Sequence, residues 1–105
     1  MSAVRVARVW HGRVAPERAD AYAAFLAART IPDYRAVAGN LGVHVLREDA
    51  VDATHFLTLT FWISEDAIRG FAGEDVLQAK YYPEDAAFLL EFEPTVRHYR
   101  VVAGG

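Results

Sequence analysis

The sequence contains no cysteine, so disulfide bonds, thiolate metal ligands and a cysteine nucleophile are excluded. Lysine occurs only at Lys80, and the formal net charge is −3, with 14 acidic residues against 11 lysines and arginines. There is therefore no basic stripe to bind phosphates, and a nucleic acid is not expected as a partner.

Long apolar runs are also missing. No stretch approaches the roughly 20 residues of a membrane span, and the first residues do not form a basic segment followed by an apolar run of signal-peptide type. We therefore expect no membrane association and a cytoplasmic location. Four common motifs are absent too: a glycine-rich phosphate loop, a Gly-x-Ser-x-Gly elbow, a His-Glu-x-x-His metal motif and a dinucleotide fingerprint.

Apolar residues, in contrast, are abundant, since 53% of the chain is hydrophobic and 12% is aromatic. A chain of 105 residues fits one domain, residues 1–105, and a domain that small buries only a little over about 60% of its unfolded surface. The chain therefore has more apolar surface than a monomer of that size can bury. Self-association into a homodimer is therefore expected.

Sequence periodicity predicts the order strand, helix, strand, strand, helix, strand. The first helix begins at Pro16, and it is expected to end before Pro32, which disfavours the helical conformation at Ile31. Ser64 followed by two acids predicts the N-cap of the second helix, which Gly73 closes. The predicted strands cover residues 4–14, 41–48, 53–62 and 94–102, the predicted helices cover 16–30 and 64–73, and shorter helical pieces are expected at 74–80 and 83–90.

This order predicts an α+β fold, a ferredoxin-like β-α-β-β-α-β domain whose four-stranded antiparallel sheet carries both helices on one face. Along the third strand, Phe56 and Trp62 point to one side while Leu57 and Phe61 point to the other, so neither face is purely polar. We expect helices on one face and a second copy of the chain on the other. Alternation alone does not tell which face lines a ligand cleft.

The four histidines all fall in predicted strands, and none is spaced from another as a local metal-ligand pair. His44 and His55 would lie nearly opposite each other if the hairpin turn were midway between them. Such a pair is either a metal site or two ordinary strand histidines, and we assign no metal. His98 is either a proton shuttle for an enolisable or phenolic substrate or a solvated side chain. His98 and His44 are the predicted catalytic bases.

Four residues are predicted to bind a substrate. Trp62 ends the third strand, and Tyr81 and Tyr82 lie in a loop that can roof a cleft, where aromatics either enclose a planar ligand or form ordinary core. Asn40 lies between two near glycines, either as a turn residue or as an amide that holds a carbonyl or peroxide oxygen.

Residues 62–68, Trp-Ile-Ser-Glu-Asp-Ala-Ile, resemble the Trp-x-Ser-x-Glu/Asp-Ala segment of the antibiotic biosynthesis monooxygenase (ABM) family of dimeric α/β barrels. Residues 39–42, residues 81–85 and the closing pair 98–99 are similar to a small bacterial subgroup, and the likeness covers nearly the whole chain. The resemblance implies a homodimeric monooxygenase without a cofactor, which oxidises polycyclic phenols to quinones because the substrate carbanion itself reduces dioxygen. It also implies an Asn, a Trp and a Tyr or His around the substrate, to which Asn40 and Trp62 correspond loosely.

Two alternatives stay open. A related branch of the family degrades haem with a ligating His on the helix after the Trp, but the corresponding place here, near residues 79–81, holds no His. The other alternative is a non-catalytic dimer that binds a small metabolite. The function expected from the sequence is thus an ABM-type monooxygenase that acts on a small aromatic or polycyclic phenolic substrate with dioxygen.

Overall fold

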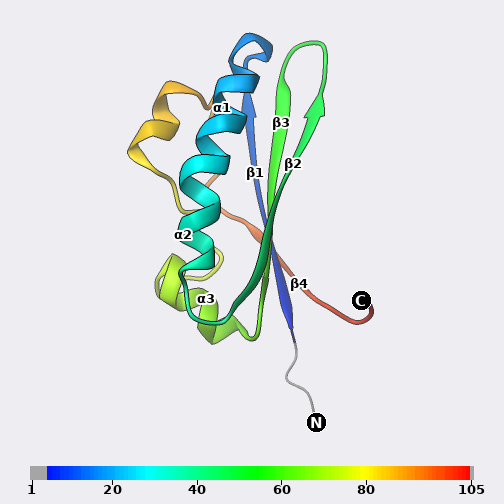
Figure 1. Cartoon of the computed structure of the whole chain (residues 1–105), viewed down its shortest axis with the longest axis vertical. Helices are drawn as coiled ribbons and strands as arrows, with labels where there is room; N and C mark the ends of the chain where they lie inside the picture. The colour runs from blue at the N-terminus through cyan, green and yellow to red at the C-terminus, as the bar shows by residue number, and fades with distance from the viewer. Residues whose placement is uncertain (1–4, 105) are drawn as a thin grey trace.

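The computed structural model describes residues 5–104, and in it a single antiparallel sheet has the strand order β2-β3-β1-β4 (Figure 1). The helices cover one face of this sheet. The predicted ferredoxin-like α+β fold is thereby confirmed. The strands are β1 Val6–Val14, β2 Asn40–Asp49, β3 Thr54–Trp62 and β4 Arg97–Arg100, and the α-helices are α1 Ala19–Phe25, α2 Ile31–Arg35 and α3 Glu65–Ala72.

The first helical segment continues past the predicted end. A 3₁₀ turn at Pro16–Arg18 leads into α1, a π turn at Leu26–Thr30 follows it, and α2 completes the segment. The N–H of Ile31 bonds to the carbonyl of Leu26, five residues back. Pro32 then occupies the first turn of α2, where its missing N–H breaks no helical bond. The expectation that the helix ends before this proline is wrong.

Helix α3 forms as its sequence predicts. The Ser64 hydroxyl accepts a hydrogen bond from the Ala67 N–H at 3.2 Å, and Gly73 ends the helix with φ of 92°, a conformation that favours glycine. The apolar side of the helix buries Ile68 and Phe71 against the sheet.

The chain between α3 and β4 contains less helix than predicted. Residues 74–80 form a turn and an isolated β-bridge between Gln78 and Thr95, so the predicted second helical piece is wrong. Besides one turn bond from the Gln78 N–H to the Asp75 carbonyl, the backbone of this segment bonds to the stretch before β4, through the Ala79 N–H and the Leu77 carbonyl. The next helical piece shrinks to a 3₁₀ turn at Pro83–Ala87. The strand predicted at 94–102 is shorter in the structure, and the predicted first residue of β1, Val4, lies outside the described residues.

The helix-facing side of the sheet builds the core in two clusters. Along β1 and β3 the side chains alternate between this buried side and a half-buried opposite side. The first cluster consists of Trp10, Val14, Ala19, Tyr22, Leu26, Phe56, Leu89 and Val96, and the second consists of Tyr34, Trp62, Ile68, Phe71 and Val76.

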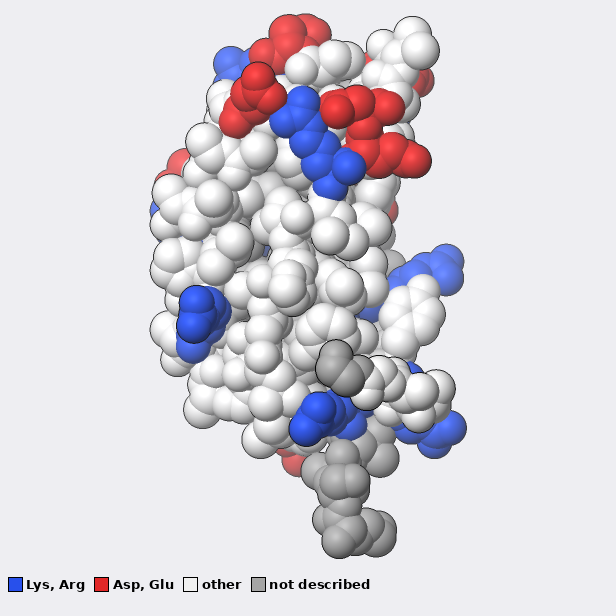
Figure 2. Space-filling model, turned by 45° about the vertical axis from the view of Figure 1, so that its right-hand side comes forward, with Lys and Arg blue, Asp and Glu red and all other residues white. Residues whose placement is uncertain are grey.

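The opposite face of the sheet, which we call the open face, has no helix over it (Figure 1). Leu41, Leu46 and Tyr99 are each about half exposed, at 48%, 45% and 51%. In the view of Figure 2, charged side chains gather towards the two ends of the molecule and are sparse over its middle. No helix within residues 5–104 is long and apolar enough to cross a membrane.

The hairpin register separates the two histidines that were expected to pair. His44 lies opposite Leu59, and His55 lies opposite Glu48. The register places the turn after Asp49, further along the chain than the midpoint between the two histidines. The predicted proximity of His44 and His55 is therefore wrong.

Candidate functional site

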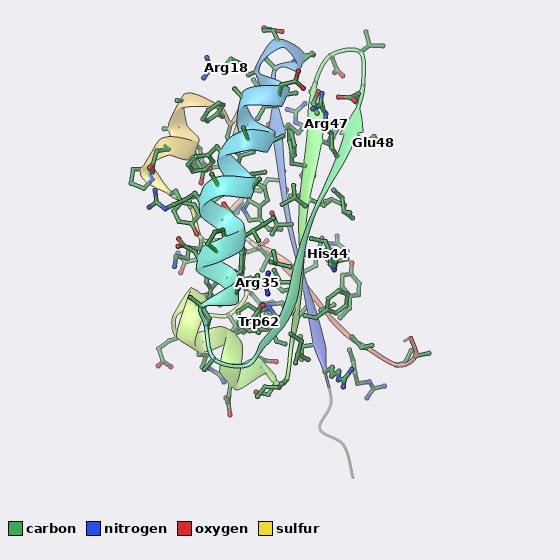
Figure 3. All side chains as sticks on the ribbon, in the orientation of Figure 1. Arg18, Arg35, His44, Arg47, Glu48 and Trp62 are labelled. Atoms are coloured by element: carbon green, nitrogen blue, oxygen red, sulfur yellow. The ribbon has the colours of Figure 1, made fainter. Side chains whose placement is uncertain are left out.

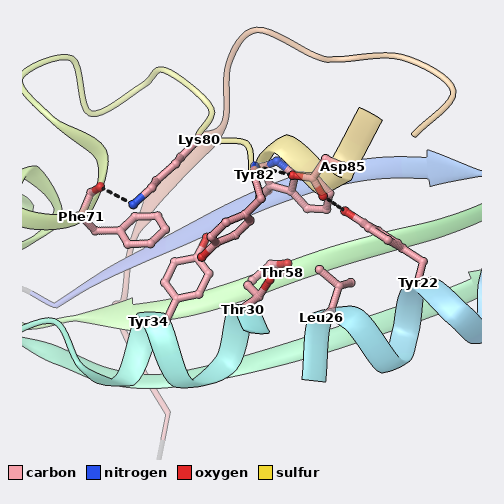
Figure 4. Close-up of a pocket in the computed structure, with 10 residues that line it drawn as sticks. Tyr22, Leu26, Thr30, Tyr34, Thr58, Phe71, Lys80, Tyr82 and Asp85 are labelled. Atoms are coloured by element: carbon pink, nitrogen blue, oxygen red, sulfur yellow. Dashed lines mark hydrogen bonds between the residues drawn. The ribbon is translucent and has the colours of Figure 1, made fainter. Parts of the chain in front are cut away.

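A narrow pocket with a free volume of about 10 Å³, room for about one water molecule, lies between the helix-facing side of the sheet and the segments that cover it (Figure 4). Strands β1 and β3 form its floor, the helical segment from α1 to α2 forms one wall, and the loop after α3 covers it. The face of β3 that contributes to this pocket is the face of Thr58. The lining residues are Trp10, Tyr22, Leu26, Thr30, Tyr34, Thr58, Phe71, Lys80, Tyr82 and Asp85.

The π turn supplies part of the pocket wall. Thr30 ends this turn, and its hydroxyl is buried without a hydrogen-bond partner among residues 5–104. The indole N–H of Trp10 is likewise buried and unpartnered there. Buried polar groups are rarely left without a partner, because each costs about 1–3 kcal/mol. π turns are frequent at functional sites. Two such polar groups beside one pocket make it a candidate site for an ordered water or a polar ligand.

One end of the pocket carries a buried carboxyl group. Asp85 is 2% exposed. Its carboxylate accepts hydrogen bonds from the Tyr22 hydroxyl at 2.9 Å and from the Tyr82 backbone N–H at 2.7 Å. Burial raises the pKa of Asp85, and burial together with the neighbouring Asp85 raises the pKa of the Tyr22 phenol. A carboxylate with a raised pKa is a better proton acceptor than an ordinary one.

The opposite end of the pocket carries positive charge. The rings of Tyr34 and Phe71 stack with their centroids 4.2 Å apart, and the ammonium of Lys80 lies 4.2 Å from the Phe71 centroid. Lys80 also donates a hydrogen bond to the Phe71 carbonyl at 3.3 Å. Burial raises the pKa of Tyr34 to about 12, and the nearby guanidinium of Arg8 acts in the opposite direction.

Arg8 is a buried cation with a side chain only 1% exposed. Its guanidinium donates hydrogen bonds to the carbonyls of Val76 and Gln78, the latter at 3.0 Å, and to Nε2 of His98 at 3.1 Å. Burial lowers its pKa. None of the ion pairs found within residues 5–104 includes Arg8 or Lys80. Both cations of this end therefore lack a carboxylate partner in that part of the chain.

Two of the predicted substrate-binding residues lie at or next to the pocket. Tyr82 lines it, and its hydroxyl donates to the Asp33 carboxylate at 2.9 Å. Trp62 points towards the helices (Figure 3) but is fully buried one layer behind the pocket, with its ring centroid 6.2 Å from that of Tyr34. Its indole N–H donates to the Thr60 hydroxyl at 2.9 Å.

The other two predicted substrate-binding residues are not among those that line the pocket. Tyr81 packs edge-on against Trp10, with ring centroids 6.0 Å apart, and its hydroxyl donates to the Glu93 carbonyl. Asn40 begins β2, and its side-chain amide donates to the Gly42 carbonyl at 3.4 Å. Tyr81 thus supports the pocket from behind Trp10, and Asn40 shapes the irregular start of its strand.

The two predicted catalytic histidines lie on opposite faces of the sheet. His44 is exposed on the open face, pointing away from the helices (Figure 3). His98 pairs with Arg8 across β1 and β4 on the helix-facing side. Because an arginine can only donate, Nε2 of His98 accepts the hydrogen bond and the ring is neutral. The pKa of His98 is lowered mainly by burial, and further by the nearby positive charge of Arg8.

A different pair of histidines meets on the open face. His11 Nε2 and His55 Nδ1 are 2.9 Å apart, and His11 Nδ1 is 2.5 Å from a carboxylate oxygen of Glu93. No sequence pattern predicts this row of hydrogen-bonded side chains, because Glu93 lies in an irregular segment, 82 residues from His11 along the chain. No group of three or more metal-binding side chains is found within residues 5–104.

The sequence analysis missed the polar residues that distinguish the pocket. The predicted helix ended at Thr30 and left Tyr34 outside it, although the two residues lie four positions apart on one side of a continuous helical segment. Asp85 lies in the first turn of the helical piece predicted at 83–90, where its carboxylate accepts a hydrogen bond from the Tyr82 N–H. The burial of the Asp85 side chain could not be predicted from the sequence, because it depends on packing against Tyr22 in the other half of the chain.

Taken together, the sheet order and the helix placement define a ferredoxin-like α+β domain with a narrow pocket between sheet and helices. Residues 5–80 match the family model of the antibiotic biosynthesis monooxygenases. Since this match covers more than half of the chain, the protein belongs to the antibiotic biosynthesis monooxygenase family. The resemblance seen at residues 62–68 is confirmed. No curated protein matches the chain.

Solved structures share the fold at low sequence identity. A protein of unknown function from Nitrosomonas europaea is 17% identical, with a TM-score of 0.74 over 100% of this chain and 96% of the other. A Bacillus cereus protein assigned provisionally as an antibiotic biosynthesis monooxygenase is 14% identical, with a TM-score of 0.64 over 98% of both chains. The Pseudomonas aeruginosa protein PA3566 is 20% identical, with a TM-score of 0.56 over 100% of this chain and 98% of the other.

Proposed function

We propose that this protein is a monooxygenase that works without a cofactor on a small aromatic, enolisable or phenolic substrate bound in the pocket beside Asp85. Family membership supports the reaction class. The observation that carries the proposal is the buried carboxyl group at one end of an otherwise largely aromatic pocket. The pocket has a free volume of about 10 Å³, room for about one water molecule, so a ring system enters it only if the aromatic lining moves apart.

The proposed chemistry needs only substrate, dioxygen and a base. A base removes a proton from an activated ring CH₂ group, and the resulting carbanion reduces dioxygen. Overall, the CH₂ group and O₂ give a C=O group and water, so the substrate supplies all four electrons. The protein has to hold the ring, accept the first proton and keep bulk water away from the carbanion.

Asp85 is the base that we propose. It lines the pocket, and its raised pKa brings its proton affinity closer to neutral pH. His98 and His44 were the bases predicted from the sequence. The Nε2 atom of His98 is occupied by Arg8, and His44 lies on the open face. That either histidine acts as the catalytic base stays a prediction, which the variants His98→Gln and His44→Gln test.

Oxygen uptake with anthrone as the probe tests the reaction. We expect the purified protein to consume oxygen and produce quinone absorbance without added metal or flavin. Removal of the base in Asp85→Asn should lower kcat by about 100-fold or more, the usual contribution of a positioned base. His98→Gln and His44→Gln serve as parallel variants. A loss in His98→Gln combined with full activity in Asp85→Asn would contradict the assignment of the base, and absence of oxygen uptake in the wild type would contradict the reaction.

We also propose a homodimer in which the open faces of two copies meet. The face is rich in half-exposed apolar side chains, including Leu57, Leu59 and Phe61 at the centre of the sheet. Leu59→Arg places a charge in this centre and should convert the dimer to a monomer, because a buried unpaired charge is costly. Light scattering after gel filtration measures the mass. Val51→Arg, at a fully exposed hairpin position, is the matched control. A wild-type mass of one chain would contradict the dimer.

A non-catalytic binding dimer is the second candidate. The unpartnered hydroxyl of Thr30 and indole N–H of Trp10 favour a bound polar ligand whether or not it is turned over. This alternative predicts a thermal shift with anthrone or related phenols, by mass action, without any oxygen uptake.

A further inference from the structure

Three side chains, Glu93, His11 and His55, form a hydrogen-bonded row on the open face. A carboxylate oxygen of Glu93 lies 2.5 Å from His11 Nδ1, and His11 Nε2 lies 2.9 Å from His55 Nδ1. The two imidazole rings are nearly parallel, with an angle of 26° between their planes. The proposed reaction uses none of these groups, because the histidines project from the side of the sheet that faces away from the pocket.

The strand register explains why the two histidines meet. His11 on β1 lies opposite Leu57 on β3, two residues beyond His55, so both rings project from the open face on neighbouring strands. Both border a hollow of about 270 Å³ at the hairpin end of this face, which is also lined by Leu46, Arg47, Glu48 and Leu57. Figure 3 shows Arg47 and Glu48 near this hairpin. The pair of ring nitrogens therefore lies beside a space large enough for an ion and its water ligands.

Glu93 fixes the orientation of the His11 ring. A carboxylate only accepts hydrogen bonds, so Nδ1 of His11 carries a proton, and Nε2 of the neutral ring directs its lone pair towards His55. Histidines that bind metal ions almost always have this arrangement, in which one ring nitrogen donates to a carboxylate or carbonyl and the other binds the metal. The row thus presents a histidine already oriented as a ligand.

The segment that carries Glu93 is itself held in place. The Tyr81 hydroxyl donates a hydrogen bond to the Glu93 carbonyl. Two residues earlier, the carboxylate of Glu91 accepts hydrogen bonds from the Arg13 side chain at 3.0 and 2.7 Å. A site whose groups are already ordered loses little conformational entropy when it binds a ligand.

We propose that Nε2 of His11 and Nδ1 of His55 bind a divalent late transition-metal ion, Cu²⁺, Ni²⁺ or Zn²⁺, with Glu93 as the residue that positions His11. Imidazole nitrogens suit these three ions. Two nitrogens that each lie about 2.0–2.1 Å from one ion are about 2.9 Å apart in a square arrangement and about 3.3 Å apart in a tetrahedral one. The observed 2.9 Å fits this range, so the strands stay in place and only the rings turn towards the hollow.

Binding changes the position of one proton. In the metal-free protein the proton between the two rings is on Nδ1 of His55, because Nε2 of His11 accepts the hydrogen bond. When the ion takes its place, this proton moves to Nε2 of His55, and no proton is released overall. No third metal-binding side chain joins the pair within residues 5–104. Water therefore fills the remaining positions, and the ion stays exchangeable.

Titration of the full-length protein, free of any histidine tag, with Cu²⁺ tests this inference by electron paramagnetic resonance. We expect one saturable site per chain, with a spectrum that shows two nitrogen ligands. His11→Gln and His55→Gln should each abolish the site at copper concentrations that saturate the wild type. Glu93→Gln should keep both nitrogens in the spectrum but weaken binding by about 10–100-fold, the usual effect of losing the partner of a metal-binding histidine.

The matched control is His44→Gln, which removes an exposed histidine from the same face and should bind copper as the wild type does. Three results would overturn the inference: no saturable binding, a spectrum with fewer than two nitrogen ligands, or unchanged binding in His55→Gln. Circular dichroism checks the folding of each variant, and the wild-type spectrum gives the number of nitrogen ligands even where a variant does not fold. Oxygen uptake with a chelator present tests the proposed function separately, because the pocket lies on the other side of the sheet.

Discussion

Trp62→Ala should lower the free energy of unfolding by about 3–5 kcal/mol, the usual cost of truncating a large buried aromatic. The indole is fully buried between β3 and the second core cluster, with its centroid 6.2 Å from the Tyr34 ring and 6.1 Å from the Phe71 ring. Truncation would leave a cavity there and free the Thr60 hydroxyl from its donor. Urea unfolding followed by circular dichroism measures the loss.

Trp62→Phe separates packing from ligand contact. It keeps an aromatic ring in the core, so its destabilisation should be clearly smaller than that of the alanine variant. Since Trp62 lies behind the pocket residues Tyr34 and Phe71, ligand affinity should change little in Trp62→Phe. A loss below about 1 kcal/mol in Trp62→Ala would show that the indole is not part of the core. The sequence-based prediction that Trp62 binds the substrate would then be favoured.

Asp85→Ala should cost about 2–6 kcal/mol of stability, because it leaves one buried and one half-buried donor without an acceptor, each worth about 1–3 kcal/mol. These donors are the hydroxyl of Tyr22 and the backbone N–H of Tyr82. Tyr22→Phe removes one of them, so the double variant should lose less than the sum of the two single losses. Additive losses in urea unfolding would contradict the contact between Asp85 and Tyr22.

The stability of the wild type relative to Asp85→Asn should also depend on pH. Burial raises the pKa of Asp85 in the folded state above its ordinary value of 3.8. The folded protein therefore binds this proton more tightly than the unfolded chain does. The stabilisation that results is fully present below 3.8 and is lost as the pH rises through the raised pKa of the folded state.

Urea unfolding of both proteins over this range measures the effect. The asparagine variant lacks the titrating group, so the unfolding free energy of the wild type should fall relative to it between acid and neutral pH. A relative rise would show that the folded environment favours the charged carboxylate. That outcome would remove the argument for Asp85 as a base with raised proton affinity.

Much of the local structure was readable because its causes are local. The alternation in β1 and β3, the Ser64 cap and the glycine at the end of α3 each depend on residues within one element. The predictions around Pro32 and residues 74–80 failed for a common reason. In both places the backbone hydrogen bonds follow a pattern that local sequence rules do not predict. Before Pro32 it is a π turn, and in residues 74–80 it is a bridge to a distant segment.

The sequence by itself thus determined the order of strands and helices, the α+β fold and the family, because periodicity and caps act over a few residues and the signature at 62–68 is continuous. Only the tertiary structure decided which side chains meet. Asp85 reaches Tyr22 across 63 residues, and Arg8 reaches His98 across 90. Strand register and helix packing bring such groups together, and these depend on the whole chain at once. The polarised pocket is therefore a property of the fold, not of any segment.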